Sequence, residues 1–209
     1  MNQKAPLSWS RLLILRIWLP ILIVVAWWLG SAGSSSLYFP PLSVIAEELA
    51  TAWLGPRFVS DLLPSLGNFL VGFLIAIVLG SVFGLLLGLN RLARDLTAPI
   101  INFLRSLPPP ALIPVVLILF GIGSPMSIAL IVLGGIWPTL LNTIDGVRSV
   151  DTQVREMVHS YRISKWQYIT RVVLPNAGPQ MFAGFRITLQ ISIILILVSE
   201  MVGATKGLG

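Results

Sequence analysis

Residues 150–179, VDTQVREMVHSYRISKWQYITRVVLPNAGP, form a polar stretch between two long apolar runs. Apolar residues recur within it every three or four positions, which is the spacing of an amphipathic helix. Ser164 is a suitable N-cap for a second helix, and Pro175 and Pro179 are expected to end that helix. The stretch therefore predicts two helices joined by a turn, placed on one aqueous side of a membrane, where a soluble partner can reach them.

The composition places the chain in a membrane. Of its 209 residues, 56% are hydrophobic and 11% are charged, and the mean hydropathy is +0.90. A soluble domain carries about 25% charged residues, so we expect an all-α integral membrane protein. The chain has no cysteine, which excludes disulfides and thiolate metal sites. The net charge of +6 is explained by the positive-inside rule, and no nucleic acid partner is expected.

Five apolar runs predict five membrane spans, at residues 17–29, 62–89, 96–120, 126–144 and 180–201. Of the 14 lysines and arginines, only Arg57 and Lys206 fall on the outer side of this topology. The rest, Arg105 and Arg186 included, fall on the inner side or at inner helix ends. The N-terminus and the polar stretch are therefore expected in the cytoplasm.

The segments between the spans follow from this topology. We expect residues 1–16 to form a cytoplasmic N-terminus and residues 147–179 a cytoplasmic loop. Residues 31–61 form an outer segment with an amphipathic surface helix from residue 42 to 53, which covers the bundle or helps to seat a partner outside the cell. The first run also fits a secretory signal peptide, but its length favours a span.

The span at residues 62–89 carries small residues at every fourth position. Small side chains allow helices in lipid to approach closely, so another helix is expected to cover this strip along its length. The covering helix could come from the same subunit or from a second one. The strip consists of Gly72, Ala76, Gly80, Gly84 and Gly88.

The span at residues 96–120 contains Arg105 and the consecutive prolines 108–110. Because a regular helix cannot continue through three prolines, we expect a helix to about Leu107, an unwound step and a second helix to Phe120. Such breaks are tolerated where they line a cavity or are buried in protein. Arg105 is either an anchor at the inner interface or a cation that faces an anionic solute or partner.

The polar stretch resembles the cytoplasmic loop of ABC importer permeases. The loop pattern is Glu-Ala-Ala, three residues, Gly, nine residues and Ile-x-Leu-Pro, and Glu156, Leu174 and Pro175 match it at the right spacing. Met157 and Val158 replace the two alanines, and Arg162 replaces the glycine that allows a sharp turn. The segments LRSLPPPALIPVVLILFGIG (104–123) and SEMVGATKGLG (199–209) resemble the branch that imports aliphatic sulfonates, taurine and nitrate. The resemblance runs from about residue 65 to residue 209.

The resemblance implies a type I ABC importer transmembrane fold for residues 1–209 as a single domain, with a sixth span after residue 209. It also implies a bacterial inner membrane location, a second permease copy in a homodimer, two ATPase subunits and an extracytoplasmic solute-binding protein. ATP and magnesium would be bound by the ATPase subunits. The chain itself has no phosphate-binding loop and a single histidine, so we expect no catalytic residues, no metal site, no cofactor and no enzymatic activity of its own.

The same resemblance assigns roles to residues. The ATPase would dock on Glu156, Met157, His159, Ser160, Tyr161, Arg162 and Trp166, and Leu174 and Pro175 would transmit its motion to the following span. Candidates for the path of a small anionic solute are Asn68, Arg105, Gln190, Ser192 and Glu200. Two other functions remain open, an ion-driven secondary transporter and a membrane scaffold that recruits a soluble protein. The former would need paired carboxylates or an internal repeat.

Overall fold

The computed structural model describes residues 9–36, 38–55 and 58–203, and the chain divides into two compact units, Met1–Phe58 and Val59–Gly209. In the first unit, α1 (Trp9–Ser31) is followed by α2 (Leu42–Leu54), where the sequence predicts a helix from residue 42 to 53. The buried hydroxyl of Ser31 accepts a hydrogen bond of 3.1 Å from the backbone N–H of Leu42. This bond joins the end of α1 to the start of α2.

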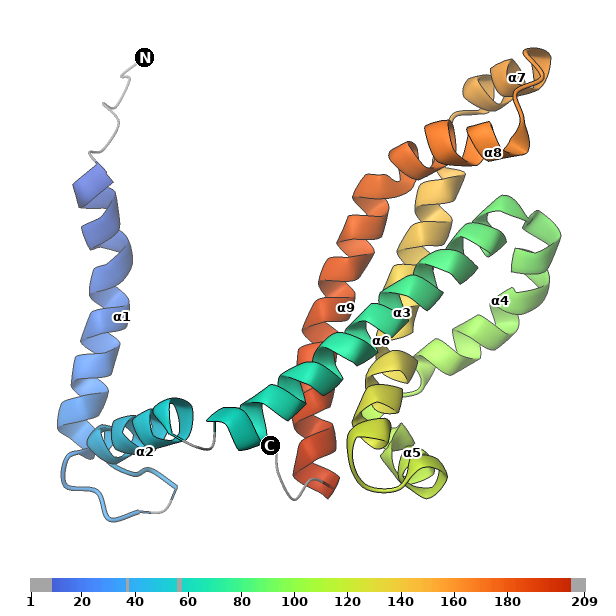
Figure 1. Ribbon diagram of the computed structural model, residues 1–209. Helices are drawn as coiled ribbons and strands as arrows, with labels where there is room; N and C mark the ends of the chain where they lie inside the picture. The colour runs from blue at the N-terminus through green and yellow to red at the C-terminus, as the bar shows by residue number, and fades with distance from the viewer. Residues whose placement is uncertain (1–8, 37, 56–57, 204–209) are drawn as a thin grey trace, which may run out of the picture. The chain divides into compact units, whose positions relative to one another are not determined.

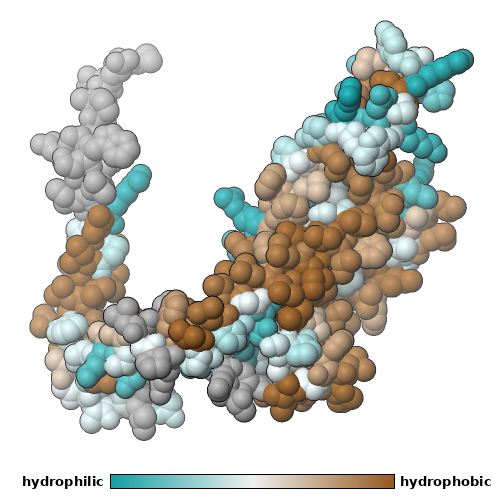
Figure 2. Space-filling model, viewed as in Figure 1, coloured by the Kyte–Doolittle hydropathy of each residue, from teal (hydrophilic) through white to brown (hydrophobic). Residues whose placement is uncertain are grey.

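Three long helices form the frame of the second unit (Figure 1): α3 (Leu63–Leu89), α6 (Ser124–Arg148) and α9 (Leu174–Gly203). Each belongs to a helical stretch that is long and apolar enough to cross a membrane. α6 packs along both of the others. Figure 2 shows apolar residues over the long helices and hydrophilic residues at the end that carries α7 and α8.

α6 of the same chain covers the strip of small residues on α3. Each step of four residues on α3 is matched by a step of four on α6, so the two helices run parallel in one register. A Cβ atom built on Gly84 would lie 2.6 Å from Cβ of Thr143 and 2.8 Å from the carbonyl oxygen of Leu140. The pairs in contact are Gly72 and Ile131, Ala76 and Gly135, Gly80 and Thr139, Gly84 and Thr143, and Gly88 and Val147.

Hydrogen bonds join α6 to α9, which runs in the opposite direction. The hydroxyl of Thr188 lies 2.8 Å from that of Thr139 and donates to the carbonyl of Gly135 at 2.8 Å. Nearer the other end, the hydroxyl of Ser199 donates to that of Ser127 at 2.9 Å. Such bonds stabilise helix pairs in lipid, where apolar contact alone gives little drive for association.

The predicted break at the prolines is confirmed. α4 (Arg91–Ser106) is followed by a 3₁₀ turn, η2 (Pro109–Leu112), and by α5 (Ile113–Phe120), with a bend of 91°. α4 begins earlier than predicted because Asn90 alone makes the turn from α3, and its side chain accepts a bond of 3.1 Å from the N–H of Ala93.

Five spans were predicted, one of them broken at the prolines, and the described residues account for part of this count. In the described part of the chain, three helices qualify as spans, or four if the bent pair is counted as one. The apolar part of α1 with described side chains, Arg16–Ser31, belongs to the shorter helices.

The prediction that a helix ends between residues 174 and 179 is wrong. α8 (Lys165–Tyr168), the π-helical turn η3 (Ile169–Val173) and α9 follow one another without a break. A π-helical turn bonds each N–H five residues back, so it widens the helix just before Pro175 and lets the chain continue. One continuous helix therefore links the polar stretch to the last apolar run.

Candidate functional site

The candidate site is the helical hairpin of α7 (Thr152–Ser160) and α8, at the end of the second unit where α6 stops (Figure 1). The Asp151 carboxylate caps α7 by accepting a bond of 3.0 Å from the N–H of Gln153. The Ser164 hydroxyl accepts one of 3.3 Å from Gln167 and caps α8, which confirms the predicted N-cap. α7, with nine residues, is too short to be stable alone, so its position depends on packing, whereas α8 is the first part of the continuous helix.

Polar and apolar contacts fix the hairpin to the long helices. Arg155 donates from Nη2 to the carbonyl of Arg148 at 2.9 Å, at the end of α6. Asn176 on α9 donates from Nδ2 to the Ser149 hydroxyl at 2.9 Å. Beneath α7, Val154 packs on a buried cluster, which consists of Val147, Val150, Val173 and Ala177. The hairpin is therefore attached to α6 and α9 together.

The turn between α7 and α8 is a complete Schellman motif. Arg162 donates its N–H to the carbonyl of His159 at 3.1 Å, and Ile163 donates to Val158 at 3.1 Å. Arg162 adopts the left-handed conformation with φ of 52°. This is the position at which the loop pattern has glycine, so the fold keeps the sharp turn although a side chain is present.

Replacing Arg162 with glycine is expected to stabilise this turn by about 1 kcal/mol, because glycine adopts the left-handed conformation without the steric cost of a Cβ atom. The check is hydrogen exchange of a peptide covering residues 157–164, which should slow about fivefold. Arg162→Ala is the matched control, since it removes the guanidinium and keeps the Cβ. Equal slowing in both variants would contradict the backbone explanation.

The proposed docking residues all lie at the surface of the hairpin. Glu156, His159, Ser160 and Arg162 are exposed, and Met157, Tyr161 and Trp166 have exposed fractions of 50%, 77% and 74%. Within the described chain, the Glu156 carboxylate makes no ion pair or hydrogen bond, and only its carbonyl accepts one, from Ser160. Two aromatic side chains and a methionine thus stand out from a polar surface, a composition typical of protein interfaces.

A groove lies between α7 and α8, and the sequence did not predict it. Its volume is about 660 Å³, and it carries the cations Arg155, Arg162 and Lys165 beside His159. Val158, Ile163 and Tyr168 complete the lining. The left-handed turn creates this groove by folding α8 back toward α7. The position and charge of the groove suit an acidic side chain of a partner.

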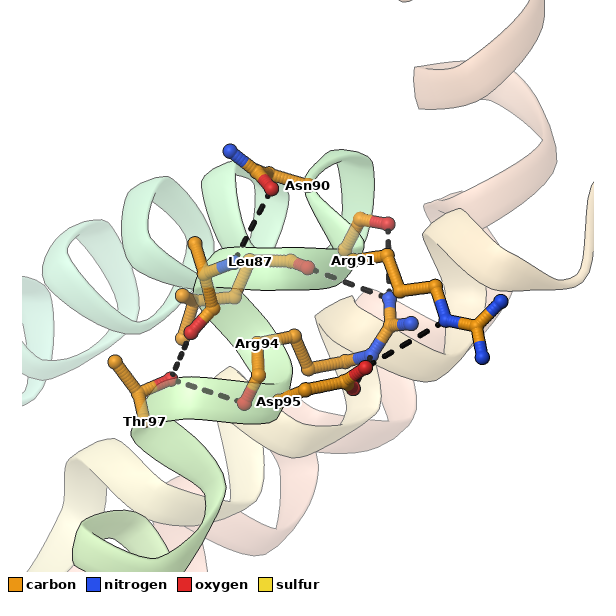
Figure 3. A network of polar contacts seen from close by, with 8 residues as sticks. Leu87, Asn90, Arg91, Arg94, Asp95 and Thr97 are labelled. Atoms are coloured by element: carbon orange, nitrogen blue, oxygen red, sulfur yellow. Dashed lines mark hydrogen bonds and ion pairs between the residues drawn. The ribbon is translucent and has the colours of Figure 1, made fainter.

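A second cationic pocket lies where the turn from α3 to α4 meets the end of α6 and the start of α7. Arg91 and Arg94 line it together with Arg148 and Arg155. Asp95 pairs with Arg91 at 3.5 Å and with Arg94 at 3.7 Å, and Arg94 also approaches the terminal carbonyls of α3 (Figure 3). The hairpin end of the unit is therefore strongly positive.

The two residues assigned to transmission lie at the junction of η3 and α9. Leu174 is half-buried and Pro175 is exposed. They belong to the continuous helix rather than to a loop. Motion of α8 would thus reach α9 along a helix and not through a joint.

The structure distributes the five solute-path candidates over different surfaces. Ser192 is fully buried and donates to the carbonyl of Thr188 at 2.7 Å, and Glu200 is 4% exposed, so both face the interior of the bundle. Gln190 lies on the exposed side of α9, and Asn68 is half-buried near the start of α3. Arg105 was counted among the inner-side charges, but it lies exposed in the last turn of α4, far from the hairpin end. Its Nε donates to the side-chain oxygen of Asn102 at 3.0 Å.

Arg186 was counted among the inner-side charges, but it lies in the middle of α9. It is exposed and lines an open pocket of about 550 Å³ with apolar walls. The other lining residues are Phe73, Pro179, Phe182, Ala183, Phe185 and Leu189. The sequence does show an arginine within an apolar run, but only the packing of α9 on α6 shows how far along the bundle Arg186 lies.

Comparison with known proteins places the chain among transport proteins. Residues 76–209 match the family described as binding-protein-dependent transport system inner membrane component. The bicarbonate transport system permease protein CmpB of Synechococcus elongatus is 32% identical over 189 residues, which cover 86% of this chain and 68% of the relative. The taurine transport system permease protein TauC of Escherichia coli is 31% identical over 208 residues (96% and 75%). The nitrate import permease protein NrtB of Synechocystis is 30% identical over 220 residues (100% and 79%).

Proposed function

This chain belongs to the family of binding-protein-dependent transport system inner membrane components, and we propose that it is the permease subunit of an ATP-driven importer for a small anionic solute. As a family member it is a multi-pass membrane protein that transports rather than catalyses. We assign it the type I transmembrane fold of the family, paired as a homodimer. Two ATPase subunits would bind ATP and magnesium, and an extracytoplasmic protein would deliver the solute.

One observation carries this proposal: the hairpin presents Met157, Tyr161 and Trp166 to solvent on an otherwise polar, cationic surface. Leaving these side chains exposed to water costs hydrophobic free energy, which a partner that buries them would recover. An ATPase that buries these side chains and places an acidic group in the groove would use every feature of the hairpin.

The charge distribution supports a cytoplasmic position for the hairpin. Arg91 and Arg94 at the start of α4, Arg148 at the end of α6 and Arg155 on α7 lie at one end of the second unit, in line with the positive-inside rule. At the opposite end, the charged side chains of the described chain are Asp61 and Glu200, both acidic. The hairpin end is thus the end that an ATPase in the cytoplasm can reach.

The path of coupling follows from the continuous helix. The segment from Trp166 to Arg186 is helical throughout and covers about 30 Å at 1.5 Å per residue. Closure of the ATPase pair on ATP would displace the hairpin, and α9 would move with it as part of one body. ATP hydrolysis would be coupled to transport if the ATPase pair with ATP bound favours one arrangement of the hairpin and α9 over the other.

The relatives support the proposed class of solute. Three of them are named for the transport of bicarbonate, taurine and nitrate, and a fourth, from Bacillus subtilis, is named as a putative permease for aliphatic sulfonates. These solutes share an oxyanion group. We therefore propose that the solute of this chain also carries an oxyanion group.

Co-purification tests the function. The tagged chain is expected to bring down an ATPase with a phosphate-binding loop, and uptake into proteoliposomes of the complex should be inhibited by vanadate. Uptake that needs an ion gradient and ignores vanadate would establish a secondary transporter instead. A soluble partner without ATPase activity, and no uptake, would establish a scaffold.

A further inference from the structure

Arg186 lies at the mid-depth of the helix bundle. Its neighbours on α9, Gly184 and Thr188, contact α6 between Gly135 and Asn142, and α6 runs from Ser124 to Arg148. Arg186 is therefore level with the middle of a membrane-spanning helix. That position is about 15 Å from either edge of a hydrocarbon layer about 30 Å thick, farther than an arginine side chain extends.

The side chain points away from its own bundle. On a helix of 3.6 residues per turn, Phe182, Arg186 and Gln190 share one face of α9, opposite the face on which Thr188 bonds to α6. Arg186 is exposed and has no hydrogen bond or ion pair within the described residues. An unpaired cation facing hydrocarbon at this depth is costly, so this face must meet water or an anion.

The surroundings of the cation define what fits there. Phe73 reaches the pocket from α3, and Phe182 and Phe185 from α9, in edge-to-face contact with ring centroids 5.6 Å apart. A guanidinium can bind an oxyanion with two parallel hydrogen bonds. The Gln190 amide, one turn farther along the same face, is a further donor. Aromatic walls beside the cation suit a short apolar group.

We propose that Arg186 holds the solute in the translocation path, as a small organic anion whose oxyanion head binds Arg186 and Gln190 and whose apolar body contacts Phe73 and Phe182. This inference rests on the proposed function, since it names the solute site of that importer. The face of α9 that bears Arg186 then borders the water-filled cavity of the assembled permease.

A cysteine label reads binding at this site directly, without the ATPase. The chain has no cysteine, so Ala183→Cys, which leaves the proposed contact residues in place, provides a unique thiol in the pocket beside Arg186. In the purified assembled permease, a water-soluble polyethylene glycol maleimide should modify this thiol. Ethanesulfonate at millimolar concentration should slow the reaction at least threefold. The protection should disappear in the double variant with Arg186→Gln and persist in part with Arg186→Lys. Tyr161→Cys, exposed on the hairpin, is the control that no anion should protect.

Three results would overturn the proposal. The thiol at position 183 could resist the water-soluble reagent, which would mean that lipid covers this face. It could react without protection by ethanesulfonate, taurine, nitrate or bicarbonate, which would remove the anion site. Nitrate could protect better than ethanesulfonate, which would remove the apolar contact.

Transport by the full complex gives a second readout. Arg186→Gln is expected to lower ethanesulfonate or taurine uptake at least tenfold while the ATPase still co-purifies. Arg171→Gln, which removes an exposed arginine outside the described pockets, should leave uptake near the wild-type rate. Absence of an ATPase would refute the proposed function and leave the labelling result to decide on the anion site. A fully active Arg186→Gln complex would refute the anion site and leave the importer function intact.

Discussion

Replacing Gly84 with valine is expected to prevent the second unit from packing. A Cβ atom at this position would lie 2.8 Å from the Leu140 carbonyl oxygen, which is backbone and cannot rotate away, and 2.6 Å from Cβ of Thr143. α3 and α6 would have to separate along their whole contact. Overpacking in well-packed interiors costs about 1–3 kcal/mol, and a backbone clash belongs at the upper end of that range or above it. The measurement is the yield of monodisperse protein in detergent and its thermal midpoint.

Gly67→Val is the matched control for this substitution. Gly67 also lies in α3, but a Cβ atom there would have no neighbour within 4 Å. Both variants place the same β-branched residue in the same helix, so their difference isolates the contact with α6. Equal yields and equal midpoints would show that α3 and α6 do not approach as closely as the structure has them.

Reversing the charge of Glu156 is expected to abolish solute-stimulated ATP hydrolysis. Glu156→Lys places a cation on a surface that already holds Arg155, Arg162 and Lys165. The exposed carboxylate has no partner in the described chain, so the substitution breaks no internal contact and the permease should still insert and fold. A charge-assisted hydrogen bond to the ATPase is worth about 1.5–3 kcal/mol, and repulsion from any cation on the ATPase adds to this loss.

Glu156→Gln separates the two contributions, because it removes the charge without introducing a cation. We expect a loss of stimulation of roughly tenfold or more in the neutral variant, as expected for one charge-assisted bond, and no measurable stimulation in the lysine variant. The measurement is ATP hydrolysis by the reconstituted complex with and without solute and binding protein. Normal stimulation in Glu156→Lys would exclude the hairpin as the docking site.

Much of the fold could be predicted because its signals are local or periodic. Glycines at every fourth position indicate a close helix contact, three consecutive prolines indicate a break, and Ser164 indicates the start of a helix. Where the prediction failed, the outcome depended on bonding that the sequence does not display. Pro175 ends most helices, yet the π-helical turn before it carries the chain through, and the buried residues Val173 and Ala177 hold that turn in place.

The candidate site could likewise be predicted only in part. The exposed residues of α7 follow from amphipathic spacing, whereas the groove depends on the left-handed conformation of Arg162, which residue type alone opposes. Ser192 and Glu200 were chosen as solute-path candidates because they are polar residues in an apolar run. Whether they are buried depends on which face of α9 packs on α6, and the sequence does not show this. Arg186 was predicted near an inner helix end because the last helix was expected to start after the prolines. The continuous helix starts at Lys165, so Arg186 lies farther along it than expected.

The matched four-residue steps of α3 and α6 restrict how this protein can move. Five successive contacts hold the two helices in one register. A shift of α3 by less than four residues would bring the side chains of Thr139, Thr143 and Val147 against its backbone. Transport therefore cannot proceed by sliding these two helices. On the proposed function, the openings that admit and release a solute would lie where these contacts are absent, at the bend between α4 and α5 and along the face of α9 that bears Arg186.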